Sequence, residues 1–361
     1  MSEITVGAFA ALGPQAPSFR VRTKIPAAEL ARHGVRMRHL PLLDEQQDRA
    51  FHGGSTARRL QAALQARRRL RRELDAARDL DVALVQRQVD LMPSLGLERR
   101  AVASAGRLVL DVDDAIWLDG SPDAGGHPLA ALKGTRRKVR WLAERAETVI
   151  AGNELLAEWL ATYADRVVVV PSLVEHRELE ARRHEQRERI VLGWIGSPST
   201  ARSLERLGEP LAALAGQGNG HQFELIVVGG PAPAIEGLHV RSEAWSEERE
   251  RQFLREVDIG LMPLPDNAWT RGKCAYKALQ YMGAGIPVVA DGVGVSADVI
   301  GHERGGLIAD STGAWREHIA TLAADPALRS RLGHEGRERV AEGFSVEAWA
   351  PTLAQIFRGN R

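Results

Sequence analysis

Short apolar runs alternate with longer amphipathic stretches from one end of this chain to the other. The apolar runs that predict strands cover residues 4–9, 35–40, 80–86, 108–111, 148–151 and 167–170, and then 190–195, 223–228, 239–241, 259–263, 287–290 and 307–309. The stretches between them are long enough for helices. This alternation is typical of parallel strands connected by helices. The pattern therefore predicts an α/β protein with two similar halves.

The boundary between the halves is marked by a change in character at residues 172–189, which are polar, rich in charge and without an apolar face. Such a stretch favours an interdomain linker. We therefore predict a first domain over 1–171, a second over 190–343, and a C-terminal helix within 344–361 that could pack back on the first domain. Ligands of such parallel sheets bind at the carboxyl ends of the strands, in a cleft.

Composition narrows the class of protein. A chain of 361 residues suits two domains. A net charge of +1 and an aromatic share of 5% argue against a nucleic-acid partner. The single cysteine excludes an internal disulfide framework and a cysteine-rich metal site. The N-terminus has no signal-peptide pattern, and no run approaches the roughly 20 apolar residues of a membrane span. We expect a cytoplasmic protein, with the inner face of the membrane as an alternative location.

The most informative stretch is RGKCAYKALQYMGAGIPVVA at 271–290. It predicts a loop, a helix that begins near Gly272 and Lys273, a left-handed cap at Gly285 and a buried strand. Free backbone N–H groups at the start of a helix, together with a lysine, can bind an anion. The same pattern is also that of an ordinary αβ unit.

A second motif, GWIGSPST at 193–200, lies at the first strand-to-helix turn of the second half. Gly196 permits a close backbone approach, Ser197 and its neighbours offer hydroxyl groups, and Arg202 adds a cation. The motif resembles a phosphate cradle, although it is neither a Walker A loop nor GxGxxG. A capping turn alone also accounts for the serines and threonine.

Together these motifs carry a resemblance to a known family. GWIGSPST followed by KCAYKALQYMGAGIPVVA is similar to the nucleotide-sugar domain of the retaining GT-B glycosyltransferases, and more narrowly to their family 4. DVDDAIW, AGNELLAEWL and VVVVPSLVEH resemble that family as well. The resemblance implies two Rossmann-like domains with sheets facing across a cleft. It also implies a donor bound mainly by the second domain, an acceptor bound mainly by the first, and retention at the anomeric carbon, usually without a metal ion.

The chain departs from the family pattern at its acidic positions. The family has two glutamates eight positions apart, which fall on Gly272 and Gln280. Gln280 can still bond a ribose hydroxyl but has no charge. Gly272 has no side chain, so the resemblance leaves contact with the transferred sugar to another residue, for which we name Asp266.

The cations that usually hold the diphosphate fall on Ser197 and Arg202. Arg202 can act as a cation and Ser197 cannot. Lys273, foremost, and Lys277 are placed to supply the missing charge, although Lys277 could equally be a solvated helix residue. We expect Cys274 to be a small residue close to this site and not a nucleophile.

In the first half, DVDD at 111–114 ends the fourth predicted strand. Asp113 or Asp114 could bond a sugar hydroxyl or act as base for the acceptor hydroxyl. Alternatively, these carboxylates cap the following turn. Asp111 and Asp113 also resemble the metal-binding DxD motif of the other glycosyltransferase fold, but that fold has a single nucleotide-binding domain, so we expect no metal.

Two clusters of basic residues have open interpretations. The arginines of the predicted helix 58–78 could contact a membrane surface, but the helix lacks the Trp and Phe of interfacial helices, which favours a solvated helix. Arg137, Lys138 and Arg140 could serve an anionic acceptor or lie at the surface.

From these observations we predict a glycosyltransferase that moves a sugar from a nucleoside diphosphate sugar to a hydroxyl of a small molecule, a glycan or a lipid-linked acceptor, without a cofactor. The alternatives are a nucleotide-sugar epimerase or hydrolase of the same fold, and a non-catalytic relative that only binds the nucleotide sugar. The sequence does not identify the base, the sugar, the acceptor or the oligomeric state.

Overall fold

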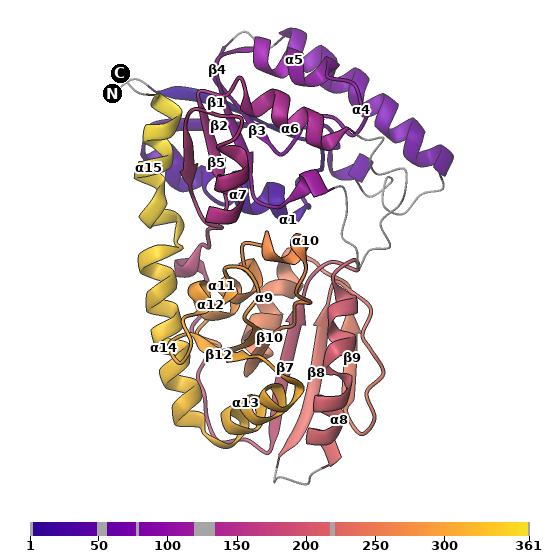
Figure 1. Cartoon of the computed structure of the whole chain (residues 1–361), viewed down its shortest axis with the longest axis vertical. Coiled ribbons are helices and arrows are strands. Elements are labelled where there is room, and N and C mark those ends of the chain that lie inside the picture. Colours follow the sequence, from indigo (N-terminus) through magenta and orange to yellow (C-terminus); the bar gives the residue numbers. More distant parts are fainter. Residues whose placement is uncertain (1–2, 49–55, 77–78, 119–133, 217–220, 360–361) are drawn as a thin grey trace. The chain divides into compact units, whose positions relative to one another are not determined.

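A computed structural model describes residues 3–48, 56–76, 79–118, 134–216 and 221–359. The chain divides into two compact units. Unit 1 comprises residues 1–173 together with 346–361, and unit 2 comprises residues 174–345. Each unit is an α/β domain with a six-stranded sheet and helices on both faces (Figure 1). The α/β fold with two Rossmann-like domains is therefore confirmed.

The sheet of unit 1 is parallel throughout, with the order β2-β1-β3-β4-β5-β6. Its strands are β1 (Ile4–Ala10), β2 (Val35–Pro41), β3 (Leu80–Gln86), β4 (Ala105–Val112), β5 (Thr148–Ala151) and β6 (Val167–Val169). Its helices are α1 (Pro17–Phe19), α2 (Ala27–Arg32), α4 (Thr56–Ala76), α5 (Gly96–Ala103), α6 (Thr135–Ala143), α7 (Glu154–Leu160) and α15 (Val346–Arg358), with short helical turns η1 (Arg20–Lys24) and η2 (Ile116–Leu118). The strands coincide with the apolar runs because both faces of a parallel sheet are covered.

Unit 2 repeats this plan with the order β12-β11-β10-β7-β8-β9, again parallel. Its strands are β7 (Arg189–Ile195), β8 (Gln222–Val228), β9 (His239–Glu243), β10 (Ile259–Met262), β11 (Val288–Asp291) and β12 (Gly306–Ala309). Its helices are α8 (Gly208–Gly216), α9 (Glu247–Glu256), α10 (Ala268–Arg271), α11 (Tyr276–Gly283), α12 (Ser296–Ile300), α13 (Thr312–Ala324) and α14 (Pro326–Gly343), with short turns η5 (His176–Glu178) and η6 (Ala201–Leu207).

The C-terminal helix α15 belongs to unit 1, where it packs against α2 and β1. Its apolar face, which includes Leu353, Ile356 and Phe357, joins a core cluster with Val6, Val35 and other strand residues. The polar stretch around 176–189 belongs to unit 2. There, the Arg182 N–H donates to the carbonyl of Ala284 (2.8 Å) and the Arg182 guanidinium pairs with Asp258 (2.8 Å).

Helix α11 is fixed to the sheet of unit 2 by one aromatic residue. The Tyr281 ring lies against Gly260 of β10, where an added Cβ would be 2.4 Å from the ring. The Tyr281 hydroxyl donates to the carbonyl of Gly193 (3.1 Å) and accepts from the Ile195 N–H (3.2 Å), so it joins α11 to the end of β7. These contacts fix α11 against the sheet.

The start of α11 differs from the sequence prediction. The helix begins at Tyr276 and not near Gly272, because Ala275 adopts a left-handed conformation (φ 50°) that interrupts the helical path after α10. The predicted cap at the other end is confirmed. Gly285 has φ 70°, and the N–H groups of Gly285 and Ile286 bond the carbonyls of Met282 and Tyr281 in a Schellman motif.

Candidate functional site

The carboxyl ends of β7 and β8 in unit 2 form a layer of closely packed glycine turns. Gly196 follows β7, and its N–H donates to the carbonyl of Val228 (3.0 Å). Gly229 follows β8 with φ 85°, and a Cβ on it would lie 2.3 Å from the carbonyl oxygen of Gly196. Gly230 would collide with Ala201 at 2.7 Å. Only residues without a side chain therefore fit these positions.

The position that a side chain on Gly196 would occupy is filled by neighbouring protein atoms. A Cβ on Gly196 would lie 2.7 Å from the ring of Trp194 and 2.8 Å from Cε of Lys277. The reason for this glycine is thus the approach of Lys277 to the turn. Trp194 is fully buried, and its indole N–H has no hydrogen-bond partner among the described residues.

The hydroxyl groups of the following turn bond to each other. Ser197 Oγ lies 2.9 Å from Ser199 Oγ and 3.4 Å from Thr200 Oγ1, and Thr200 Oγ1 donates to the carbonyl of Ser197 (3.0 Å). No side-chain N-cap bond begins η6. Arg202, the second residue of η6, is exposed. The hydroxyl groups therefore do not cap the helical turn η6, as the alternative interpretation expected. They stabilise the turn that precedes it.

The segment before α11 brings two lysines to the same end of the sheet. The ammonium of Lys277 lies 4.7 Å from the centre of the Trp194 ring, and that of Lys273 lies 4.9 Å from the centre of the Trp269 ring. Both lysines are half-buried. Cys274, between them, is buried and forms no disulfide. Gly272 is a buried residue at the end of α10.

Lys277 has an unusual electrostatic environment. No carboxylate of the described residues forms an ion pair with it. Burial, and to a lesser degree the charge of Lys273, lower the pKa of Lys277 from 10.5 to about 7. One turn further along α11, Gln280 is only 4% exposed, and its amide makes no hydrogen bond to another described residue.

Asp266 lies in the loop before α10, on the protein surface. Its two oxygens accept from Nε (2.6 Å) and a terminal nitrogen (2.9 Å) of Arg271, so the pair is bidentate. The hydrogen bond and the charge of Arg271 lower the pKa of Asp266. Both residues are more than half exposed, and ion pairs in such positions contribute little to stability.

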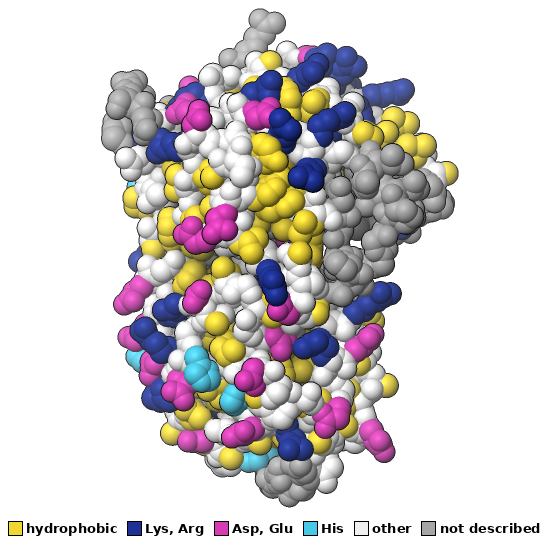
Figure 2. All heavy atoms as spheres, in the orientation of Figure 1, with side chains coloured by type: hydrophobic (Ala, Val, Ile, Leu, Met, Phe, Trp, Pro, Cys, Tyr) yellow, Lys and Arg dark blue, Asp and Glu magenta, His cyan; other side chains and the backbone are white. Residues whose placement is uncertain are grey.

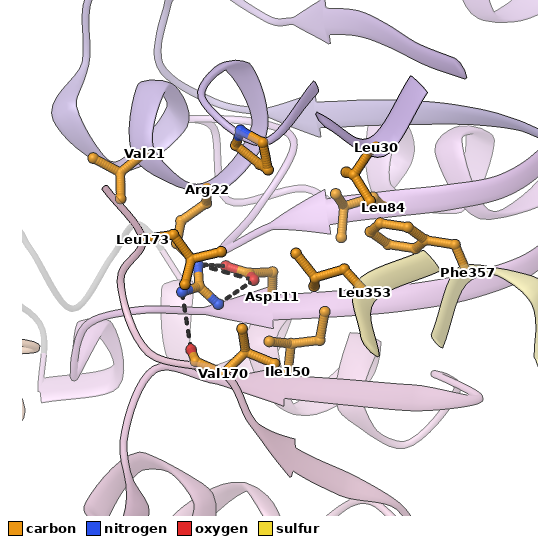
Figure 3. A pocket seen from close by; sticks show the side chains of 11 residues that line it. Val21, Arg22, Leu30, Leu84, Asp111, Ile150, Val170, Leu173, Leu353 and Phe357 are labelled. Atoms are coloured by element: carbon orange, nitrogen blue, oxygen red, sulfur yellow. Dashed lines mark hydrogen bonds and ion pairs between the residues drawn. The ribbon is translucent and has the colours of Figure 1, made fainter. Parts of the chain in front are cut away.

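In unit 1, each of the three aspartates at the end of β4 forms hydrogen bonds within the protein. Asp111 is 3% exposed, and the Arg22 guanidinium bonds both of its oxygens (3.0 Å from Nε to Oδ1 and 2.7 Å from a terminal nitrogen to Oδ2). Arg22 also donates to the carbonyls of Val170 and Pro171. Figure 3 shows this pair in a small pocket with apolar walls, which include Leu353 and Phe357 of α15. The Asp111 carboxylate is therefore already bonded by an arginine and would have to leave this partner before it could serve as a ligand of a DxD metal site.

Asp113 and Asp114 share a second arginine, Arg87, which no sequence motif had singled out. Arg87 follows β3 with φ 63°, a conformation rare for residues other than glycine. Its Nε donates to Asp113 (2.5 Å), and a terminal nitrogen lies 3.4 Å from Asp114. Gln86 also donates to Asp113 (3.0 Å), and Asp114 accepts from the Ala115 N–H (3.2 Å). Burial raises the pKa of Asp113, but the charge and hydrogen bond of Arg87 outweigh it, so the net pKa is lowered.

A further buried ion pair lies between α5 and α6. Lys138 and Glu98 are both fully buried and lie 2.8 Å apart, and the Lys138 ammonium also donates to the carbonyl of Asp90 (2.6 Å). The surface interpretation of Lys138 is therefore wrong. The periodicity of α6 does place Lys138 beside Val139 and one turn before Leu142, on the buried face. That spacing was the signal that could have located it.

Two other features of unit 1 concern its surface. Figure 2 shows Lys and Arg side chains gathered over the part of unit 1 that carries α4 and α5, and Leu60 and Leu64 of α4 are also exposed. Among the described residues, no helix combines the length and the apolar character that crossing a bilayer requires. The predicted loop 120–128 lies outside the described residues.

Comparison with known proteins agrees with this architecture. Residues 189–325, which form most of unit 2, match the model of the family described as glycosyl transferases group 1. No curated protein matches the chain in sequence at a significant level.

Several solved structures are similar over their whole length. HepE from Anabaena in complex with UDP-glucose has a TM-score of 0.69 at 14% identity, with 99% of this chain and 100% of HepE covered. Sucrose-phosphate synthase from Thermosynechococcus elongatus has a TM-score of 0.68 at 14% identity, with 99% and 98% covered. WaaG, a glycosyltransferase involved in lipopolysaccharide biosynthesis, has a TM-score of 0.63 at 15% identity, with 99% and 100% covered. The chain has the two-domain GT-B fold of glycosyltransferases.

Proposed function

We propose that this protein is a glycosyltransferase that moves a sugar from a nucleoside diphosphate sugar to an acceptor hydroxyl, with retention of the anomeric configuration as in family 4. The observation that carries the proposal is the group of unsatisfied polar side chains at the carboxyl edge of unit 2, within the segment that matches the glycosyltransferase family. Lys277 has no carboxylate partner, and the Gln280 amide and the Trp194 indole N–H make no hydrogen bond to described residues. Buried polar groups are normally paired, so a ligand is the natural partner here.

The donor diphosphate is assigned to the turn after β7 and to the start of α11. Lys277 and Lys273 supply positive charge, and α11 has no side-chain N-cap that would compete for its backbone N–H groups. Arg202 of η6 and the hydroxyl of Ser197, in the turn before it, are assigned to the same diphosphate, as are the small residues Gly196, Gly272 and Cys274. Cations at this place stabilise the negative charge that develops on the departing diphosphate. Gln280 is assigned to a ribose hydroxyl.

The donor sugar is assigned to Asp266, whose exposed pair with Arg271 can open at little cost. HepE holds UDP-glucose in its complex, so UDP-glucose is the first donor to test. The acceptor hydroxyl is assigned to unit 1, at Asp113 and Asp114. A carboxylate with a lowered pKa is a poor general base at neutral pH, so we assign Asp113 to orienting the hydroxyl. The leaving phosphate oxygen would then take the acceptor's proton.

The reaction is proposed to need no metal ion. In a DxD site, two carboxylates would hold a divalent cation against the diphosphate. In this chain, Arg22 bonds both oxygens of Asp111, and Arg87 bonds Asp113 and approaches Asp114. The charge that a metal would supply is assigned instead to the lysines of unit 2.

A turnover assay with a panel of nucleotide sugars tests the proposal. The full chain is incubated with each donor, with and without a panel of hydroxyl acceptors, and nucleoside diphosphate and sugar products are measured. Release of nucleoside diphosphate that depends on an acceptor, with an α-linked product from an α-linked donor, is the expected result. Consumption of donor without an acceptor would identify an epimerase or a hydrolase. Donor binding without turnover across a broad acceptor panel would identify a binding protein that lacks catalytic activity.

A further inference from the structure

The choice of lysine at positions 273 and 277 is itself unusual in this chain. Lysine and arginine together number 48, and almost all of them are arginine, since lysine stands only at positions 24, 133, 138, 273 and 277. Two of these few lysines lie within one turn of the proposed diphosphate site. Lysine differs from arginine in one physical respect that matters here, because it can lose its proton when it is buried, whereas arginine stays charged.

Lys277 is held in place by neighbours that offer it no counter-charge. Its Cε fills the space beside Gly196, and its ammonium lies over the face of Trp194. The charged group that acts on it is Lys273, which is also positive. Asp291, the carboxylate at the end of β11, accepts from the Leu264 N–H (2.7 Å) and the Trp315 indole N–H (3.1 Å) and forms an ion pair with Arg206 (3.8 Å).

These surroundings act on the two charge states of Lys277 in opposite directions. Burial and Lys273 favour the neutral amine and lower the pKa to about 7. The Trp194 ring attracts the ammonium, a contact worth about 0.5–1 kcal/mol at partly exposed sites, and so offsets part of that effect. In the free protein the amine therefore changes charge within the physiological range. Because Lys277 is half-buried, an incoming anion can still reach it.

We propose that Lys277 is a proton-linked receptor for the diphosphate, and that it takes up one proton from the solvent as a nucleoside diphosphate binds beside Gly196. This inference rests on the proposed function of the site and adds to it a dependence on pH. The proton moves from the buffer to Nζ, and no covalent bond to the ligand forms. The two negative phosphates then provide the counter-charge that the protein itself lacks.

The direction of the pH dependence follows from these charge states. Below pH 7 the amine is protonated in the free and the bound protein, so pH has no effect through this group. Above pH 7 the free protein must first gain a proton, and the apparent affinity falls until the pKa of the bound state is reached. If only the protonated form binds, a group with a pKa near 7 weakens binding about tenfold at pH 8 relative to pH 6.

Calorimetry with the full chain tests the proton uptake directly. UDP, ADP and GDP are titrated at pH 8.5 in two buffers with different enthalpies of ionisation, and the difference in measured heat gives the number of protons taken up. At this pH the terminal phosphate is already fully ionised, since its second pKa is about 6, so it contributes no proton. The expected uptake is close to one proton in the wild type and in Lys273→Arg, and close to zero in Lys277→Arg, whose charge is permanent.

Each outcome has a distinct meaning. Nucleotide binding without proton uptake in the wild type would overturn the inference and leave the proposed donor site standing. Equal uptake in Lys277→Arg would also overturn it, because the proton would then go elsewhere. If no nucleotide binds, the proposed function fails and the inference fails with it. Where nucleotide binds, NMR titration of ¹³C-methylated lysines checks the inference independently of the calorimetry. A Lys277 signal that titrates above about pH 9.5 in the free protein, near the ordinary lysine pKa of about 10.4, would exclude it.

Discussion

The buried charged side chains near the carboxyl edges of the two sheets have different kinds of neighbours. In unit 1, Asp111 faces Arg22, Asp113 faces Arg87, and Lys138 faces Glu98. In unit 2, Lys277 faces an aromatic ring, a glycine turn and a second lysine. Lys138 and Lys277 show this difference most directly. They are the same residue type in similar folds, but only Lys138 has a carboxylate partner.

The difference indicates at which edge these charges have a counter-charge within the protein, and at which edge a ligand could supply it. Charges that are paired within the protein hold its own elements together, as Lys138 holds α6 to α5 and to the segment after β3. A cation that is partly buried without a counter-charge destabilises the fold, and such groups cluster at functional sites. The contrast therefore supports the proposed assignment of the diphosphate to unit 2, and it favours a structural role for the paired Asp111 and Lys138 of unit 1.

The largest effect is expected on removing the paired lysine. Lys138→Met leaves Glu98 buried without its cation, so we predict a loss of about 3–5 kcal/mol in the free energy of unfolding, measured by urea denaturation. Lys138→Met combined with Glu98→Gln removes the uncompensated charge while keeping a similar shape, and should recover at least about 1 kcal/mol. Unchanged stability in Lys138→Met would show that the pair is not structural.

Removal of the unpaired lysine should have the opposite sign. The pKa of Lys277 is lower in the folded protein than in the unfolded chain, so the unfolded chain binds more protons between pH 7 and about pH 10. Stability should therefore rise with pH across this window in the wild type, by an amount on the order of 2 kcal/mol relative to Lys277→Met.

Urea denaturation at pH 7 and pH 9.5 measures this difference, with both proteins compared at each pH so that other titrating groups cancel. We expect Lys277→Met to be the more stable protein at pH 7 and to lose that advantage at pH 9.5. A variant less stable than the wild type at both values would mean that Lys277 is a structural residue like Lys138.

The third effect concerns binding. Lys273→Ala should weaken the affinity for a nucleoside diphosphate about tenfold at pH 7, because a charge-assisted hydrogen bond or ion pair to phosphate contributes about 1.5–3 kcal/mol. Isothermal titration with UDP measures it. Lys24→Ala, which removes the same charge from unit 1, is the matched control and should leave the affinity unchanged. Equal weakening in both variants would point to a general effect of net charge.

The smallest effect is expected on removing divalent cations. Because arginines bond Asp111 and Asp113, turnover of the nucleotide sugar should be unchanged in EDTA. Loss of turnover in EDTA, with recovery on adding Mg²⁺ or Mn²⁺, would show that these pairs open to admit a metal ion.

Most of the fold could be predicted from the sequence, because apolar runs locate strands whose two faces are both covered. Gly285 was also predictable as a left-handed cap, since few other residues adopt that conformation. The start of α11 was not, because Ala275 is left-handed and alanine gives no signal for it. Ala275 is buried in the same core cluster as Tyr281, so its conformation belongs to the tertiary packing and not to local propensity.

The site was predictable only in part for a similar reason. The glycine turns and the lysines stand close together in sequence motifs. The partners of the acidic residues come from distant positions, as with Arg22, which is 89 residues from Asp111. Arg87 gave no signal either, because its role depends on a rare backbone conformation after β3. Pairing across the sheet therefore decided which of the predicted residues are available to a ligand.

The most direct test of the contrast uses the small number of lysines in the chain. The protein is reductively methylated with ¹³C, the methyl signals are assigned with single Lys→Arg variants, and UDP or UDP-glucose is added at pH 7. We predict that the signals of Lys273 and Lys277 shift on addition of ligand, while that of Lys24 in unit 1 stays in place. Ligand binding that shifts the Lys24 signal and leaves Lys273 and Lys277 unaffected would contradict this account.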